Sequence, residues 1–163
     1  MRLKPLLQWT RKDDLTLSHV HLTPTYAEAC DGFGLVRVPG AFGAEALLRG
    51  DDLRAIRVGA REPAEVHLEA DHAVVTVGEA RYRVRLCPYT YPDTDAFWPQ
   101  GEAAFAIKVA APLLKRLADL ALAYDAHSWM AVHLTFFAPD KPLTFAFETT
   151  SGSAEGLIMP MLR

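Results

Sequence analysis

Two histidines near the N-terminus have a spacing that could bind a metal ion. His19 and His21 lie two residues apart in a stretch, 15–22, that we expect to be a strand, so both side chains would lie on the same face. Imidazole nitrogens bind zinc, but a site needs at least three protein ligands. No third ligand is identifiable close to them in the sequence. We therefore predict two ordinary strand histidines and no bound metal.

Motifs for catalysis are missing from the sequence. Gly32-Phe33-Gly34 invites comparison with a dinucleotide-binding loop, but the third glycine is absent and no helix follows at once. Asp31-Gly32 is instead typical of a hairpin turn. The sequence contains no Ser-centred nucleophile elbow, P-loop, Cys-x-x-Cys or His-Glu-x-x-His pattern. We predict a protein that is not an enzyme and needs no cofactor.

Three arginines alternate along one strand, where they could form a track for phosphates or half of a charged ladder. The residues that we expect across the sheet are acidic or neutral, and opposite charges facing each other stabilise the exposed side of a sheet. The pattern favours the ladder. The arginines are Arg81, Arg83 and Arg85, and the expected neighbours are Glu65, His67 and Glu69.

The elements that must position these residues form three units of a helix followed by strands. The helices begin near Leu3, Ala44 and Pro112; the third has its apolar residues three and four apart, and Gly50 interrupts the second, which could be two short pieces. Strands are expected over 15–22, 26–30 and 35–38 in the first unit, over 64–86 with a turn at Gly78-Glu79 in the second, and over 105–109, 130–136, 143–147 and 156–163 in the third.

Composition sets the outer limits. The 163 residues, 50% hydrophobic and 23% charged, can bury one good core or one core plus a subdomain. No apolar run is long enough to span a bilayer, so we expect a soluble cytoplasmic protein. Cys30 and Cys87 are too few for a disulfide framework and are expected to be buried thiols. The 12 Arg, 5 Lys and absence of Asn are found in heat-adapted proteins but also follow from GC-rich coding.

Three segments resemble the bacterial sliding clamp, the beta subunit of DNA polymerase III. The closing Met159-Pro160-Met161 followed by a basic residue resembles the Met-Pro-Met-Arg end of that family. Residues 91–99 look like the aromatic-Pro-Asp…Pro segment that links clamp domains, and residues 29–32 look like the Ala-Thr-Asp-Gly hairpin of the clamp. The order of the three segments is that of the family, and the likeness is strong from Tyr91 onward.

The resemblance implies an α+β fold of clamp-like repeats of helix plus antiparallel strands, amounting to about one and a half clamp domains. We expect a two-unit domain over 1–88, a linker over 89–103 and a third unit over 104–163. The full-length family has three complete domains, so an ordinary dimeric ring is in doubt. We expect the third unit to be an unpaired half that packs on a partner copy in a homo-oligomer.

The resemblance also implies contact with double-stranded DNA, without sequence specificity, through basic residues on the helices. A net charge of −3 disfavours a conventional DNA-coating domain but not a ring held on DNA by topology. The candidates offer phosphate contacts, although each could equally be an ordinary solvent-side charge of an amphipathic helix. They are Lys115, Arg116, Arg49, Arg54 and Lys12, with Lys4, Arg11 and Arg57 beside them.

A second implied surface is a groove for short peptide motifs of replication or repair proteins. The matching residues are Met159, Pro160 and Met161, with Leu162 and Arg163 at the margin. Methionines are adaptable liners of promiscuous grooves, and proline suits an edge strand because it lacks the N–H needed for further pairing. The alternative is that both methionines belong to the core of the last strand.

Three functions remain open from the sequence. The first is a clamp-like accessory protein of DNA replication or repair that tethers partners on DNA. The second is a clamp-fold module that binds linear peptides, or modulates a clamp, without encircling DNA. The third, an enzyme on an unrelated α+β scaffold, has no catalytic motif in its favour.

Overall fold

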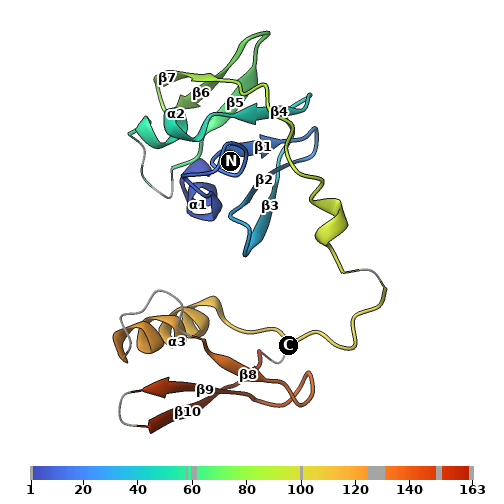
Figure 1. Ribbon diagram of the computed structural model, residues 1–163, viewed down its shortest axis with the longest axis vertical. Coiled ribbons are helices and arrows are strands. Elements are labelled where there is room, and N and C mark those ends of the chain that lie inside the picture. The colour runs from blue at the N-terminus through green and yellow to red at the C-terminus, as the bar shows by residue number, and fades with distance from the viewer. Residues whose placement is uncertain are drawn as a thin grey trace. The chain divides into compact units, whose positions relative to one another are not determined.

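The computed structural model describes residues 2–57, 59, 62–99, 101–124, 131–149 and 152–161. The chain divides into two compact units, Met1–Trp98 and Pro99–Arg163. The first contains two helix-plus-sheet modules and the second contains one (Figure 1).

The first module joins a short helix to three antiparallel strands. Helix α1 (Leu3–Leu6) continues as a 3₁₀ turn, η1 (Leu7–Trp9). Strands β1 (Val20–Leu22), β2 (Tyr26–Cys30) and β3 (Leu35–Pro39) follow, and β4 (Ala46–Leu48) completes a sheet of order β3-β2-β1-β4.

The second module begins with the strand that joins the two sheets. Strand β4 (Ala46–Leu48) pairs with β1, and its Leu48 also forms a bridge to Leu86, just beyond β7. Helix α2 (Gly50–Ala55) leads into β5 (Glu65–Leu68), β6 (His72–Val77) and β7 (Ala80–Arg85), a sheet of order β5-β6-β7. Gly50 packs against the Ser18 carbonyl so closely that a Cβ would collide with it, so α2 can begin there only with glycine.

Both modules contribute to a single core. Leu3 and Leu6 of α1 and Leu53 and Ile56 of α2 pack with apolar residues of both sheets, and α1 contacts α2. Residues 89–98, including the 3₁₀ turn η2 (Asp95–Phe97), also belong to this unit.

The second unit is a single module. Helix α3 (Ala111–Tyr124) precedes β8 (His133–Thr135), β9 (Leu143–Thr149) and β10 (Gly152–Ile158), in the order β10-β9-β8. Its core is formed by Leu117 and Ala121 of α3 with residues of β9 and β10: Leu143, Phe147 and Ile158. None of the described helices is long and apolar enough to cross a membrane.

Several predicted elements differ in extent. Residues 15–19 form turns, because the Asp14 carboxylate accepts hydrogen bonds from the backbone N–H groups of Thr16 and Leu17. The predicted helix 44–56 is a strand followed by a short helix that starts at Gly50. Segment 105–109 is not a strand, and the described residues give it one backbone hydrogen bond between elements, from Met161 N–H to Lys108 C=O.

The last two predicted strands differ at their ends. The strand predicted over 130–136 is confined to His133–Thr135, and Met130 lies outside the described residues. The final strand ends at Ile158, before the proline. Leu162 and Arg163 lie outside the described residues.

Candidate functional site

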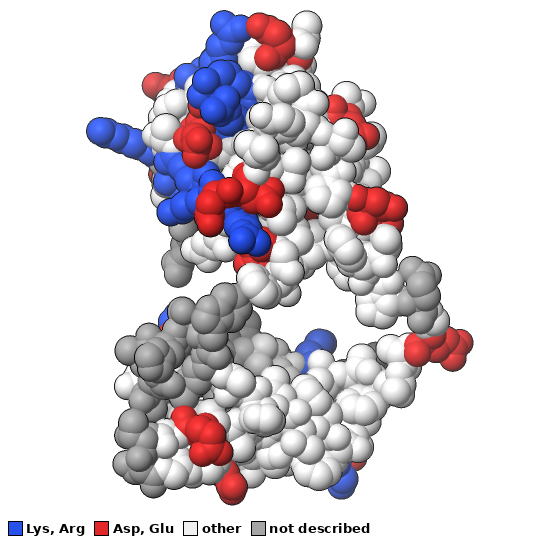
Figure 2. Space-filling model, in the orientation of Figure 1, with Lys and Arg blue, Asp and Glu red and all other residues white. Residues whose placement is uncertain are grey.

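Three of the predicted DNA-binding residues come together in the first unit. Lys12 and Arg49 line the same hollow, of about 230 Å³, and Ser18 lies in its wall. Arg54 reaches Ser18 from α2 through a bond of 3.3 Å from Nη2 to the Ser18 carbonyl. Figure 2 shows basic side chains of this unit gathered on one side, with acidic side chains among them. The surface is therefore mixed in charge rather than uniformly positive.

Arg54 is engaged within the protein. Its Nη1 lies 3.0 Å from Asp51 Oδ1, and its Nη2 donates to Thr10 Oγ1 at 2.7 Å. The bonds to Thr10 and to the Ser18 carbonyl fasten α2 to the segment that precedes β1. Arg49 is half-buried, and its Nε has no hydrogen-bond partner among the described residues. Of the three, Lys12 is the most exposed.

The other two predicted DNA-binding residues lie on α3 in the second unit. Lys115 and Arg116 are both exposed, on the side of α3 away from its buried Leu117. Lys115 Nζ lies 2.6 Å from Asp119 Oδ2, one turn further along the helix. Such a surface pair contributes well under about 1 kcal/mol and is easily exchanged for another anion.

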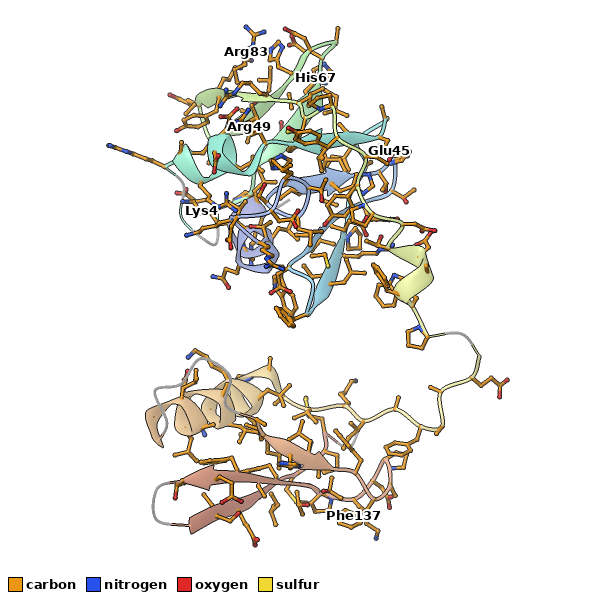
Figure 3. The ribbon with its side chains drawn as sticks, viewed as in Figure 1. Lys4, Glu45, Arg49, His67, Arg83 and Phe137 are labelled. Atoms are coloured by element: carbon orange, nitrogen blue, oxygen red, sulfur yellow. The ribbon has the colours of Figure 1, made fainter. Side chains whose placement is uncertain are left out.

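We predicted that the arginines of β7 face the acidic and histidine side chains of β5 across the sheet. This prediction of cross-strand neighbours is wrong. Strand β6 lies between the two charged strands, so Arg83 faces Val74 and not His67 (Figure 3). Arg83 pairs instead with Asp71 in the turn before β6, and Arg85 with Asp52 of α2. The alternation in the sequence correctly predicted which face of the sheet is exposed, but it did not predict the order of the strands.

The tail residues predicted to line a peptide groove differ in their exposure to solvent. Met159 and Met161 are 56% and 52% exposed, whereas Pro160 is buried. The methionines are thus not core residues. The N–H of Met161 donates to the carbonyl of Lys108 at 2.7 Å, which fixes the tail beside the segment that leads into α3.

The first unit contains a buried polar network that was not predicted from the sequence. The carboxylate of Glu28, on β2, is 1% exposed and lies 2.7 Å from His21 Nδ1 and 2.7 Å from Arg37 Nε. Thr94 donates to it at 2.9 Å. His21 Nε2 lies 3.0 Å from Oε1 of Glu45, the residue just before β4. A buried carboxylate is tolerated here because charged and hydroxyl donors compensate its desolvation.

The network also holds residues 89–98 on the sheet. The Arg37 guanidinium lies over the rings of Tyr26 and Trp98, at 4.5 and 5.2 Å, and its Nη2 lies 2.7 Å from Asp95 Oδ1. The His21 ring stacks on Tyr91 at 4.7 Å. Burial opposes the charge on His21, but its hydrogen bonds to the Glu28 and Glu45 carboxylates outweigh burial and raise its pKa.

His19 has different partners from His21. Its Nε2 lies 2.8 Å from Cys87 Sγ, and its Nδ1 lies 2.9 Å from Ser18 Oγ. Burial lowers the pKa of His19 and raises that of Cys87, so the pair is a neutral hydrogen bond and not an activated thiolate. Among the described residues no three His, Cys, Asp or Glu side chains are grouped to hold a metal ion.

One signal for the network was present in the sequence. Glu28 is the single charge in Tyr-Ala-Glu-Ala-Cys, residues 26–30, and a lone charge within an apolar strand predicts a buried ion with a specific partner. Its partners could not be predicted, because Arg37 and Thr94 are brought to it by strand pairing and by the path of residues 89–98.

Comparison of the structure with solved structures gives consistent matches. The sliding clamp of Bacillus subtilis matches with a TM-score of 0.72 at 14% identity, over 95% of this chain and 45% of that one. The beta sliding clamp of C. crescentus matches at 0.69 and 14%, over 98% and 48%, and the DNA polymerase III beta chain of Streptococcus pneumoniae at 0.66 and 16%, over 98% and 47%.

This is the sliding-clamp fold. The predicted α+β fold and the resemblance to a shortened clamp are confirmed. The chain spans about half the length of the solved sliding clamps it matches. No protein-family model matches the sequence, and no curated protein matches it. The sliding-clamp fold is thus established from the structure.

Proposed function

We propose that this protein is a sliding-clamp-like accessory factor of DNA replication or repair, which tethers partner proteins on double-stranded DNA without sequence specificity. The observation that carries the proposal is the sliding-clamp fold over 95 to 98% of the chain in the matches above. Lys115, Arg116 and Lys12 are exposed and could contact phosphates, while Arg49 is half-buried and Arg54 is bonded to Asp51 and Thr10.

The tail supports a docking role for partner peptides. Met159 and Met161 are exposed thioethers on either side of a buried proline, on a segment that is fixed to Lys108. Flexible, polarisable side chains on a held backbone suit the binding of varied apolar motifs. The ligand class is a short linear peptide with apolar anchors.

A second candidate is a clamp-fold interaction module that binds such peptides, or modulates a clamp, without encircling DNA. Two of the five predicted DNA-binding cations, Arg54 and Lys115, are paired with acidic residues, and the net charge is −3. Both features weaken attraction to DNA. Neither feature affects the proposed binding of peptides at the tail.

Retention on circular DNA separates the two candidates. The protein is mixed with immobilised nicked-circular plasmid and, in parallel, with the same plasmid linearised, and both are washed at rising salt. A tether held by topology stays on the circle and slides off the linear molecule, whereas electrostatic binding responds equally to salt on both. Equal loss from both plasmids, together with peptide binding, would favour the interaction module. A purified clamp loader is included in a parallel reaction.

A further inference from the structure

One flank of α3 is an exposed apolar ridge. Leu114, Ala118 and Leu122 are four residues apart and lie beside the buried stripe of Leu117 and Ala121. A ridge with a small residue at its centre allows a second helix to approach closely. In the first unit α1 and α2 contact each other and share one core. In the described part of the second unit α3 has no second helix beside it.

The edge of the sheet next to α3 is also incomplete. Strand β8 is the first strand after its helix, as β1 is in the first module. Val20 and Leu22 of β1 are completely buried, and β4 pairs along the edge of β1. Leu134 of β8 faces Phe145 on the core side of the sheet but is 42% exposed. The core side at β8 therefore continues beyond the area that α3 covers.

Segment 105–109 occupies the place that β4 has in the first unit. The carbonyl of Leu47, three residues before α2, accepts the N–H of Cys87 from beyond β7. The carbonyl of Lys108, three residues before α3, accepts the N–H of Met161 from beyond β10 in the same way. Strand β4 pairs on its other edge with β1. No described strand pairs with the other edge of segment 105–109.

We propose that the third module binds a second copy of itself and so completes a clamp domain between two chains. In this arrangement β8 of each chain pairs with segment 105–109 of the other, as β1 pairs with β4. The two α3 helices cross antiparallel at Ala118, and Leu114 packs against the partner's Leu122. The contact is symmetric, with the same surface on both sides.

A second copy fits because the third module has two open edges that could pair with each other between chains. They are the edge of β8 and the edge of segment 105–109. The half-exposed apolar side chains Phe105, Leu114, Leu122, Leu134 and Phe136 each offer roughly 80 Å². Two copies thus bring roughly 800 Å² of apolar surface, and the paired backbone adds to this toward the lower bound of about 1,200 Å² for stable interfaces.

The pairing concerns the third module only and does not depend on DNA or peptide binding.

Light scattering after gel filtration, or native mass spectrometry, of the full chain tests the pairing. The unaltered protein is expected to be dimeric, and Leu122→Glu should raise the dissociation constant at least about 30-fold, because it places a charge in the apolar contact with Leu114, one turn from the crossing point. Leu157→Glu is the matched control: Leu157 and Leu122 are 59% and 57% exposed, but Leu157 lies on the opposite face of the sheet from the core. That control should remain dimeric, and circular dichroism verifies folding of both.

A cysteine at the crossing point tests the geometry directly. Ala118→Cys should form a disulfide-linked dimer under mild oxidation, whereas Ser153→Cys, at an exposed site in β10, should not. The unaltered chain, with Cys30 and Cys87, measures the background. A protein that stays monomeric at all concentrations overturns the proposal. So does a dimer that Ala118→Cys fails to link and Leu122→Glu fails to weaken. No DNA or peptide is present, so the plasmid-retention and peptide-binding experiments test the proposed function separately.

Discussion

Thr94 Oγ1 lies 2.9 Å from each carboxylate oxygen of Glu28, 66 residues earlier in the chain. Glu28 is in the middle of β2, and Thr94 lies in the segment that we predicted to link the two parts of the protein. Part of segment 89–103 therefore satisfies a buried charge of the first unit. Tyr91 and Asp95 of the same segment also contact this unit, so the unit includes these residues as well as its two sheets.

Replacing Glu28 with glutamine is expected to reduce the free energy of unfolding by about 3 kcal/mol, because Arg37 and His21 lose their buried counter-charge. Urea denaturation followed by circular dichroism measures the change. Glu45→Gln is the matched control: it alters the other carboxylate on His21, which is 73% exposed, and should cost less than about 1 kcal/mol. Equal losses for the two variants would contradict the assigned role of Glu28.

The same network predicts how stability depends on pH. Burial opposes both charges, but the bonds between the partners raise the pKa of His21 above its usual 6.5 and lower that of Glu28 below its usual 4.5. The His21 contribution is complete below pH 6.5 and is lost as pH rises through the raised pKa. The Glu28 contribution is present above pH 4.5 and is lost as pH falls through the lowered pKa. The pair therefore contributes most between these two values.

Urea denaturation from pH 6.5 upward, on the unaltered protein and on His21→Gln, isolates the His21 part. The unaltered protein should lose stability with rising pH more steeply than His21→Gln does. The difference between the two curves removes other titrating groups, among them His19, whose pKa burial lowers. Parallel curves would show that folding does not raise the pKa of His21.

Reversing the two basic residues on α3 should weaken DNA binding. Lys115→Glu with Arg116→Glu is expected to reduce affinity for duplex DNA and to lower the slope of log affinity against log salt by about 2, one for each lost phosphate contact. Fluorescence anisotropy at several salt concentrations measures both. The control is Arg81→Glu with Arg83→Glu, on the exposed face of the β5–β7 sheet. If the two pairs behave alike, α3 is not the DNA-facing surface.

Truncating the tail methionine Met161 should weaken peptide binding without unfolding the protein. Met161→Ala is expected to weaken binding of a clamp-motif peptide at least tenfold, while the midpoint of thermal unfolding stays within about 2 °C, because the side chain is half exposed and its backbone bond to Lys108 is kept. Isothermal titration calorimetry measures the affinity. Leu157→Ala, similarly exposed but on β10, is the control. Unchanged affinity in Met161→Ala would place the docking site elsewhere.

The sequence predicted those features that are encoded locally. The apolar spacing of Leu113, Leu117 and Ala121 located α3, and alternation located β5, β6 and β7 with their turn at Gly78. The hairpin at Asp31-Gly32 followed from its turn residues, and Gly32 has a φ of 90°. Properties set by packing were not predictable in this way. The order β5-β6-β7, which separates Arg83 from His67, and the partners of Glu28 depend on contacts between distant parts of the chain.

Segment 105–109 shows that a strand pattern in the sequence does not by itself produce a strand. Its alternation of apolar and polar residues is typical of a strand, and the helix that follows lies where it was expected. A strand also needs neighbours, and the described residues supply one on one side only, at Lys108. The side-chain pattern therefore indicates the capacity to pair, and not the presence of a partner.

The position of Thr94 and Asp95 has a consequence for how the protein is made. Synthesis proceeds from the N-terminus, and β1, β2 and β3 leave the ribosome long before the residues that complete the shell around Glu28 and Arg37. Until residue 95 has emerged, Glu28 and Arg37 lack Thr94 and Asp95 as bonding partners. The first unit can therefore complete its folding only after residues 94 and 95, which lead into the second unit, have been synthesised.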